Sequence, residues 1–160
     1  MNIKLLSDSF IVRRLNAEDV GVIYDLCCEN KIFYEYHPPF VTKESILEDM
    51  AALPPGKNYN DKFFVGFFEN DILVAIMDLI LDYPAEGICF IGLFMMNLNY
   101  QNKGVGSKII KECKKHLHIS GFNKIRLGVD KNNPQSNAFW KKNGFEQIDE
   151  NEYILMESAL

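Results

Sequence analysis

The stretch NLNYQNKGVGSKIIKECKKHL, residues 97–117, decides how the chain folds. It follows ICFIGLFMM (88–96), a run without a single charge, and it contains two glycines, Gly104 and Gly106, only two positions apart. The succession predicts a buried strand, a glycine loop and an amphipathic helix that starts near Ser107. The apolar face of that helix is expected to hold Ile109, Ile110, Cys113 and Leu117.

The glycine loop is a candidate anion site. The first N–H groups of a helix have no partner within the helix and lie at the positive end of its dipole, which favours a phosphate. Glycines without a Cβ let an anion approach the main chain, and Lys103 and Lys108 add positive charge beside it. The alternative is a loop that only turns tightly.

Two familiar phosphate loops do not fit the residues. A dinucleotide fingerprint requires a third glycine at position 109, where Ile109 stands, and the pattern G-x-x-x-x-G-K-[ST] of nucleotide triphosphate loops is absent. The chain that follows Gly106 is also too short for the remaining strands of a doubly wound fold. These nucleotide-binding classes are therefore excluded.

Composition predicts one globular domain that spans residues 1–160, with 48% apolar and 24% charged residues. No apolar run reaches the ~20 residues needed to cross a bilayer, and the N-terminus lacks the pattern of a signal peptide, so we expect a cytoplasmic protein. The four cysteines show neither disulfide nor zinc spacing and are interpreted as reduced core thiols, and no metal site is expected. They are Cys27, Cys28, Cys89 and Cys113.

Charge is distributed unevenly along the chain. The net charge is −5, yet residues 101–142 hold ten Lys and Arg against two Asp and Glu, whereas the rest of the chain is strongly acidic. The basic segment favours either an anion site or a solvated helix face. Nucleic-acid binding is not expected, because the aromatic residues lie elsewhere in the sequence.

The N-terminal part alternates strands and helices. Residues 10–15 predict a strand, Asn16 starts a helix, and Thr42 caps another helix. Between the two helices, KIFYEYHPPFV (31–41) is interpreted as a loop rich in aromatic residues. The first helix is expected to bury Val20, Ile23, Tyr24 and Cys27, and the second Ile46, Leu47, Met50 and Leu53.

The remaining segments predict a sheet. Residues 62–68 and 72–81 have the pattern of a hairpin, which continues into 88–96 as an antiparallel meander. Residues 124–129 form a strand that a right-handed crossover would place parallel to 88–96. A helix between Asn133-Pro134 and Asn143-Gly144 and two last strands, near FEQID and YILME, complete the chain.

Two sequence blocks resemble the GNAT acyl-CoA N-acyltransferases. Residues 101–106, Gln-Asn-Lys-Gly-Val-Gly, match the family pattern Q/R-x-x-G-x-G/A that follows the fourth strand. A second block resembles N-x-x-A/S-x-x-F-Y/W-x-K-x-G-F, in Asn133, Ser136, Phe139, Trp140, Lys142, Gly144 and Phe145. The resemblance covers about residues 88–146, with a strand between the blocks.

The resemblance implies an α+β fold with a mixed, mostly antiparallel, twisted sheet. It implies about six or seven strands, about four helices and two splayed parallel strands at the cofactor site. It also implies acetyl-CoA as cofactor, with the pyrophosphate on the glycine loop and the pantetheine arm along residues 94–96. The implied cofactor residues are Phe94, Met95, Met96, Gln101, Asn102, Lys103, Gly104, Val105, Gly106, Ser107, Asn133, Ser136, Phe139, Trp140 and Lys142.

The resemblance also implies how the acetyl group is activated. A main-chain N–H near Met95 or Met96 would polarise the thioester carbonyl, while both methionine side chains pack as core. Many family members have a tyrosine acid where Trp140 stands, and an indole N–H cannot serve as that acid. Trp140 is therefore expected to pack against the cofactor wall, and Tyr153, a water or no acid at all would assist the leaving thiolate.

A carboxylate is needed to take the proton of the attacking amine. Asp78 and Asp82 are the candidates, since strict alternation puts them on one strand face where burial would raise their pKa; each is otherwise a solvated or capping carboxylate. Acceptor contacts are expected from the aromatic loop and the turn at 82–87. These residues are Glu35, Tyr36, His37 and Tyr83, with Glu35 a further base candidate.

The sequence thus predicts transfer of an acetyl group from acetyl-CoA to a primary amine on a small molecule, by direct attack in a ternary complex. Two alternatives stay open: a coenzyme A binding module without turnover, and an acetyltransferase that acts on a protein or RNA-bound amine. No membrane partner is expected, and a homodimer is left open.

Overall fold

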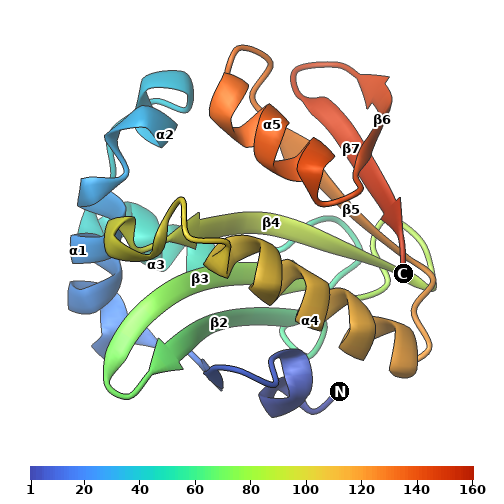
Figure 1. Cartoon of the computed structure of the whole chain (residues 1–160), viewed down its shortest axis with the longest axis horizontal. Coiled ribbons are helices and arrows are strands. Elements are labelled where there is room, and N and C mark those ends of the chain that lie inside the picture. Colours follow the sequence, from blue (N-terminus) through green and yellow to red (C-terminus); the bar gives the residue numbers. More distant parts are fainter.

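A seven-stranded sheet forms the centre of the molecule, in the strand order β1-β2-β3-β4-β5-β7-β6 (Figure 1). All neighbours are antiparallel except β4 and β5, which are parallel. The computed structural model describes all 160 residues. The strands are β1 Ile11–Arg14, β2 Lys62–Glu69, β3 Ile72–Ile80, β4 Ile88–Met96, β5 Lys124–Val129, β6 Glu146–Glu150 and β7 Ile154–Ala159.

Five α-helices and three short 3-10 turns surround the sheet, and the mixed α+β class with its meander β2-β3-β4 and parallel β5 is confirmed. The helices are α1 Val20–Glu29, α2 Lys31–Tyr36, α3 Lys43–Ala51, α4 Val105–Ile119 and α5 Pro134–Lys142. The 3-10 turns are η1 Ile3–Leu6, η2 Ala17–Asp19 and η3 Leu98–Tyr100.

The helices divide between the two faces of the sheet, each with its own core. α4 and α5 pack on one face, where the predicted stripe of α4 is confirmed: its four apolar residues are at most 1% exposed. α1 and α3 pack on the other face. Burying an apolar face of each helix against the sheet supplies the main stabilisation of such a layered fold.

Two expectations for the N-terminal helices are wrong. Residues 31–36 are helical as α2, since no glycine or proline interrupts KIFYEY before Pro38 and its aromatic side chains pack against the core of α1 and α3. In α3 only Ile46 is fully buried; Leu47 is 43% exposed and Leu53 lies beyond the helix end. In α1 the predicted face is buried, with Tyr24 half-buried at its edge.

Candidate functional site

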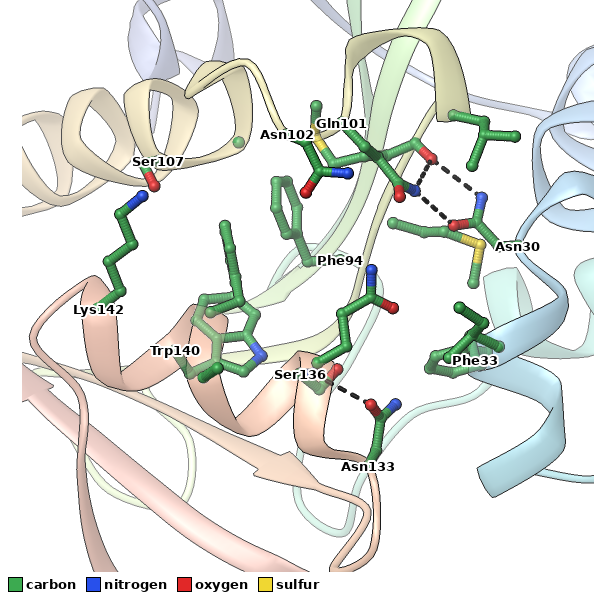
Figure 2. Close-up of a pocket in the computed structure, with 18 of the residues that line it drawn as sticks. Asn30, Phe33, Phe94, Gln101, Asn102, Ser107, Asn133, Ser136, Trp140 and Lys142 are labelled. Atoms are coloured by element: carbon green, nitrogen blue, oxygen red, sulfur yellow. Dashed lines mark hydrogen bonds between the residues drawn. The ribbon is translucent and has the colours of Figure 1, made fainter.

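β4 and β5 separate at one end of the sheet. They pair only from Ile88 opposite Lys124 to Ile91 opposite Leu127, whereas β4 runs on to Met96 without a partner on that side. A cavity of about 560 Å³ lies at this fork. Its wall combines the end of β4, the loop before α4, one face of α5 and the junction of α1 with α2 (Figure 2).

Aromatic side chains pack against one another beside the fork. Phe94 on β4 stacks on Phe139 of α5 with ring centroids 5.9 Å apart, and Trp140 stands edge-on to Phe139 at 5.0 Å. Trp140 also contacts Phe145 and is only 7% exposed. These rings belong to the core on the α4–α5 face of the sheet, and Trp140 forms part of the cavity wall together with Phe94 and Phe139.

The loop before α4 presents free main-chain donors to the cavity. Gly104 lies at φ +78° directly before the helix, and no side chain caps this end of α4. A Cβ added to Gly104 would meet no atom within 4 Å, so the glycine lines open space. An uncapped N-terminus of a fifteen-residue helix facing such space binds an anion through its N–H groups and its dipole.

Gly106 has a different role from Gly104. A Cβ at this position would come within 3.2 Å of the Phe139 ring and 3.5 Å of the Met96 sulfur. The missing side chain therefore lets the first turn of α4 pack closely against α5. Of the two glycines in the motif, one leaves room for a ligand and the other for a neighbouring helix.

A hydrogen-bonded clamp joins the end of β4 to the α1–α2 junction (Figure 2). The side-chain amide of Asn30 donates to the main-chain oxygens of Met96 and Leu26, at 2.9 Å each. Gln101 Nε2 donates to Asn30 Oδ1 at 2.8 Å and to the Met96 oxygen at 3.2 Å. The side chain of Gln101, the first residue of the glycine motif, therefore holds two parts of the protein together.

Thirteen of the fifteen predicted cofactor residues line this cavity. They are Phe94, Met95, Met96, Gln101, Asn102, Gly104, Gly106, Ser107, Asn133, Ser136, Phe139, Trp140 and Lys142. The exceptions are Lys103, whose Nζ donates to the Asn99 oxygen at 2.8 Å, and Val105, which packs against the core. Asn133 caps α5 by accepting the Ser136 N–H at 3.1 Å.

Asp78 lies beside the fork, where β4 carries a bulge. Asp78 pairs with Leu93 and Leu79 with Ile91, so Gly92 is an additional residue in β4. A Cβ on Gly92 would lie 2.8 Å from the Asp78 Oδ2, so only glycine leaves room for this carboxylate. Gly92 is also the first residue of β4 beyond the pairing with β5. The carboxylate therefore borders the point where the strands part.

The side chain of Asp78 lies on the face of the sheet opposite to α4. Ile76, two residues before it on β3, and Phe64, directly opposite it on β2, belong to the core that packs against α1 and α3. Lys62, two residues before Phe64, shares this face, and its Nζ donates to Asp78 Oδ2 at 2.7 Å. The fork is thus flanked by the candidate anion site on one face and a buried ion pair on the other.

The ion pair leaves one carboxylate oxygen free. Asp78 is 8% exposed and Lys62 3%, yet Asp78 Oδ1 is buried without a hydrogen-bond partner. Burial raises the pKa of Asp78, and Lys62 opposes that rise. Burial also raises the pKa of Asp49 on α3, which senses the same Lys62 charge. An unpartnered buried acceptor is costly unless a ligand completes it.

Asp82 and Tyr83 belong to the turn after β3, so the expectation that Asp82 shares a strand face with Asp78 is wrong. β3 ends at Ile80, and Asp82 has φ +51°. Its Oδ1 accepts the Gly87 N–H at 2.7 Å, which closes the turn into β4. Tyr83 stands edge-on to Phe90 at 5.5 Å. Of the roles considered for Asp82, a base or a capping carboxylate, the structure therefore shows the capping carboxylate.

The other predicted acceptor residues gather at the end of α2. His37 Nδ1 lies 3.2 Å from Asp130 Oδ1, just beyond β5, and its ring is 6.2 Å from that of Tyr153. Glu35 is exposed and Tyr36 half-buried on the same short helix. None of these four predicted residues, Tyr153 included, lines the 560 Å³ cavity.

Sequence reasoning missed three residues that shape the site: Asn30, Lys62 and Gly92. Asn30 carried one local signal, since asparagine is common at a helix end, but its partners are distant in sequence. Lys62 and Gly92 reach Asp78 only through strand register.

No three His, Cys, Asp or Glu side chains converge as metal ligands, and no helix has the length and apolar character of a membrane span.

A fork with a cavity, an uncapped helix end and an aromatic wall suits a long ligand that carries a phosphate. A model of the acetyltransferase (GNAT) family matches residues 23–145, which include the clamp, Asp78 and the whole cavity wall. The chain therefore belongs to the GNAT acetyltransferase family. A search of curated protein sequences finds no significant match.

Solved structures share the fold at low sequence identity. The PaiA N-acetyltransferase of Thermoplasma acidophilum, solved with coenzyme A, is 22% identical with a TM-score of 0.72, over 95% of this chain and 99% of that one. An acetyltransferase of Thermus thermophilus is 16% identical with a TM-score of 0.80, over 95% and 97%. The ribosomal-protein-S18-alanine N-acetyltransferase of Escherichia coli is 12% identical with a TM-score of 0.65, over 92% of both chains.

The cofactor of this family is acetyl-CoA, and the residues at the fork fit it. The open space at Gly104 beside the uncapped α4 suits a pyrophosphate. The unpaired edge of β4 offers main-chain groups to an extended arm that carries amides. Both features meet in one cavity, as a ligand with both parts requires.

Proposed function

We propose that the protein transfers the acetyl group of acetyl-CoA to the primary amine of a small molecule by direct attack in a ternary complex. One observation carries the proposal: the fork has an anion-binding cavity on one face and a buried carboxylate with a free oxygen on the other. Cofactor and amine would therefore approach the same gap from opposite faces of the sheet.

The main chain of Met96 supplies the polarising donor. The Asn97 N–H donates to Val74 of β3 at 2.8 Å. Because the main-chain groups of successive residues in a strand point to opposite edges, the Met96 N–H points toward the fork. The Met96 oxygen points the same way and is held by the clamp. A preorganised N–H of this kind stabilises the charge that develops on an acyl oxygen.

Asp78 acts as the proton acceptor. Acetyl-CoA, when bound at the fork, would supply a thioester whose carbonyl carbon the amine nitrogen attacks, with the coenzyme A thiolate as the leaving group. The proton lost by the amine goes to Asp78, directly or through a water. A primary ammonium has a pKa near 10, so a carboxylate whose own pKa is raised by burial is better matched to this transfer than an exposed one.

No side chain in the cavity is required as an acid. A free thiol has a pKa of about 8.5, so a thiolate leaves at neutral pH without full protonation. Trp140 occupies the position of the family's tyrosine and is fixed among aromatic rings. Tyr153 lies beside His37, outside the cavity, and is therefore not our first candidate for this role.

The acceptor is proposed to be a cation. The buried pair of Asp78 and Lys62 is neutral, and Asp49, which forms no ion pair but senses the same Lys62 charge, adds negative charge to this face when it is ionised. An ammonium group placed near Asp78 Oδ1 would restore the balance and complete the unpaired oxygen. Glu35, Tyr36, His37 and Tyr83 remain proposed contacts at the rim of this face.

The test is release of the coenzyme A thiol from acetyl-CoA in the presence of a panel of small primary amines, N-terminal peptides and lysine peptides. We expect turnover with small amines, and mass spectrometry should find the acetylated product. Turnover restricted to peptides would favour a protein substrate. The position of Trp140 favours a second candidate, a coenzyme A binding module, which predicts tight binding of acetyl-CoA without thiol release from any amine.

A further inference from the structure

A second cavity, of about 320 Å³, continues from the first between α4 and the end of α5. It has the two residues Ser107 and Lys142 in common with the larger cavity. Figure 2 shows these two side chains pointing toward one another across the gap between the helices. The complete lining is Ser107, Ile110, Lys111, Lys114, Lys142 and Asn143.

Three of the six lining residues are lysines and none is acidic. Lys111 and Lys142 are exposed and take part in none of the ion pairs of the molecule. Lys115, one turn beyond Lys111 on α4, pairs instead with Asp8 at 3.0 Å. The groove is therefore a concentration of uncompensated positive charge.

Lys114 forms the floor of the groove. Its Nζ donates to the Ser158 hydroxyl at 2.7 Å and lies 5.6 Å from the centre of the Phe145 ring. Burial lowers the pKa of Lys114, and no carboxylate compensates it. An ammonium group has three donors, so at least one remains for an anion after the bond to Ser158.

A ligand held at the fork must extend in this direction. If its thiol end lies between β4 and β5 and its pyrophosphate at Gly104, the remainder passes the first turn of α4 at Ser107. The lysine groove begins at that residue. The part of coenzyme A beyond the pyrophosphate is an adenosine with a 3′-phosphate, a monoester with a charge of roughly −1.5 to −2 at neutral pH.

We propose that Lys111, Lys114 and Lys142 bind the 3′-phosphate of coenzyme A, so that this protein selects coenzyme A over its 3′-dephospho form. The inference rests on the proposed function, because it presupposes that coenzyme A occupies the fork. Lys111 is the specificity residue of the three: it lines only the groove, it carries no structural hydrogen bond, and its removal leaves the core intact.

The experiment measures the dissociation constants of coenzyme A and 3′-dephospho-coenzyme A by isothermal titration, for the wild-type protein, Lys111→Gln and Lys115→Gln. We expect the wild type to bind coenzyme A at least roughly tenfold more tightly, as charge-assisted contacts to a phosphate would give. Lys111→Gln should reduce this preference by about three- to fivefold, the range of one exposed ion pair. Lys115→Gln should leave it unchanged.

The ligand pair separates the subsite from the cofactor site itself. Equal affinity of the wild type for both ligands would overturn the subsite while leaving the proposed function intact. Binding of neither ligand would overturn both. A preference that survives in Lys111→Gln and in the double variant Lys111→Gln/Lys142→Gln would place the phosphate elsewhere and also contradict the proposal.

Discussion

Among the residues of the proposed cofactor site, Gly104 is the one whose substitution we expect to weaken binding most. Gly104→Val places a β-branched side chain in the open space before α4. We expect acetyl-CoA affinity to fall about 10- to 100-fold, the equivalent of one lost charge-assisted hydrogen bond. Isothermal titration measures the change.

Gly121→Val is the matched control, because Gly121 also has a positive φ and open space around it but lies far from the cavity. Both variants carry the same backbone strain, about 1–2 kcal/mol. If the two lost affinity equally, the effect would be one of stability and the phosphate cradle would be wrong.

Asp78 and Asp82 form a second matched pair. Asp78→Asn keeps the shape of the side chain but removes the proton acceptor, so kcat/KM for the amine should fall roughly 10²- to 10⁴-fold with the affinity for acetyl-CoA retained. Asp82→Asn should retain full kcat/KM, because Asp82 only caps a turn. Steady-state kinetics with both variants tests whether Asp78 is the general base. Full activity of Asp78→Asn would show that this carboxylate has no catalytic role.

Lys62 sets the pH at which Asp78 ionises. Burial raises the pKa of Asp78 and Lys62 lowers it, so Lys62→Met should raise it further. Because only the ionised carboxylate accepts a proton, kcat/KM increases as the pH rises through that pKa. This acidic limb of the plot of kcat/KM against pH should move to higher pH in Lys62→Met. Lys57→Met, which removes a partly buried pair with Asp61 outside this site, should not move it. If the acidic limb of the pH profile stayed in place in both variants, a group other than Asp78 would be responsible for it.

Local motifs made part of the site predictable at this scale. The anion loop and the cap at Asn133 depend on residues within a few positions of each other, so their spacing in the sequence specifies them. The pair of Lys62 with Asp78 could not be predicted in the same way. Counting back from the hairpin turn places Phe63 opposite Asp78, but a bulge at Phe67 shifts the register and places Lys62 on the same face as Asp78.

The clamp operates between elements, since it joins α1 and α2 to the end of β4 and the loop before α4. We expect Asn30→Ala and Gln101→Ala to be non-additive in kcat/KM by about 1 kcal/mol, because each removes the same shared hydrogen bond. A double-mutant cycle measures this coupling. Asn30→Ala combined with Asn58→Ala, a loop residue away from the cavity, should be additive. Additivity in both cycles would contradict the clamp.

Helices and strands with a regular hydrophobic pattern could be predicted from the sequence, whereas the short helix α2 could not. The stripe of α4 and the alternating strands of the meander follow from their own residues. α2 is less than two turns long, and its stability comes from packing against α1 and α3, which no local pattern records. The partners Asn30 and Gln101 are 71 residues apart.

At the scale of the whole molecule, the charges are separated in the way that the two proposed substrates would require. The basic segment 101–142 supplies the loop, α4 and α5 for an anionic cofactor, and the acidic remainder includes Asp49 and Asp78 on the opposite face. The sequence predicts this division and the fold that separates the two faces. It does not predict which amine fits, because the face proposed for the acceptor is formed by α2, α3 and two turns without a motif of their own.

The central claim is that the fork binds acetyl-CoA, and isothermal titration of the full chain with acetyl-CoA tests it most directly, with free coenzyme A, NAD and ATP as comparison ligands. We predict saturable binding of one acetyl-CoA per chain, similar binding of coenzyme A, and much weaker binding of NAD and ATP, which lack the pantetheine arm. A folded protein that shows no binding of acetyl-CoA or coenzyme A would contradict the account.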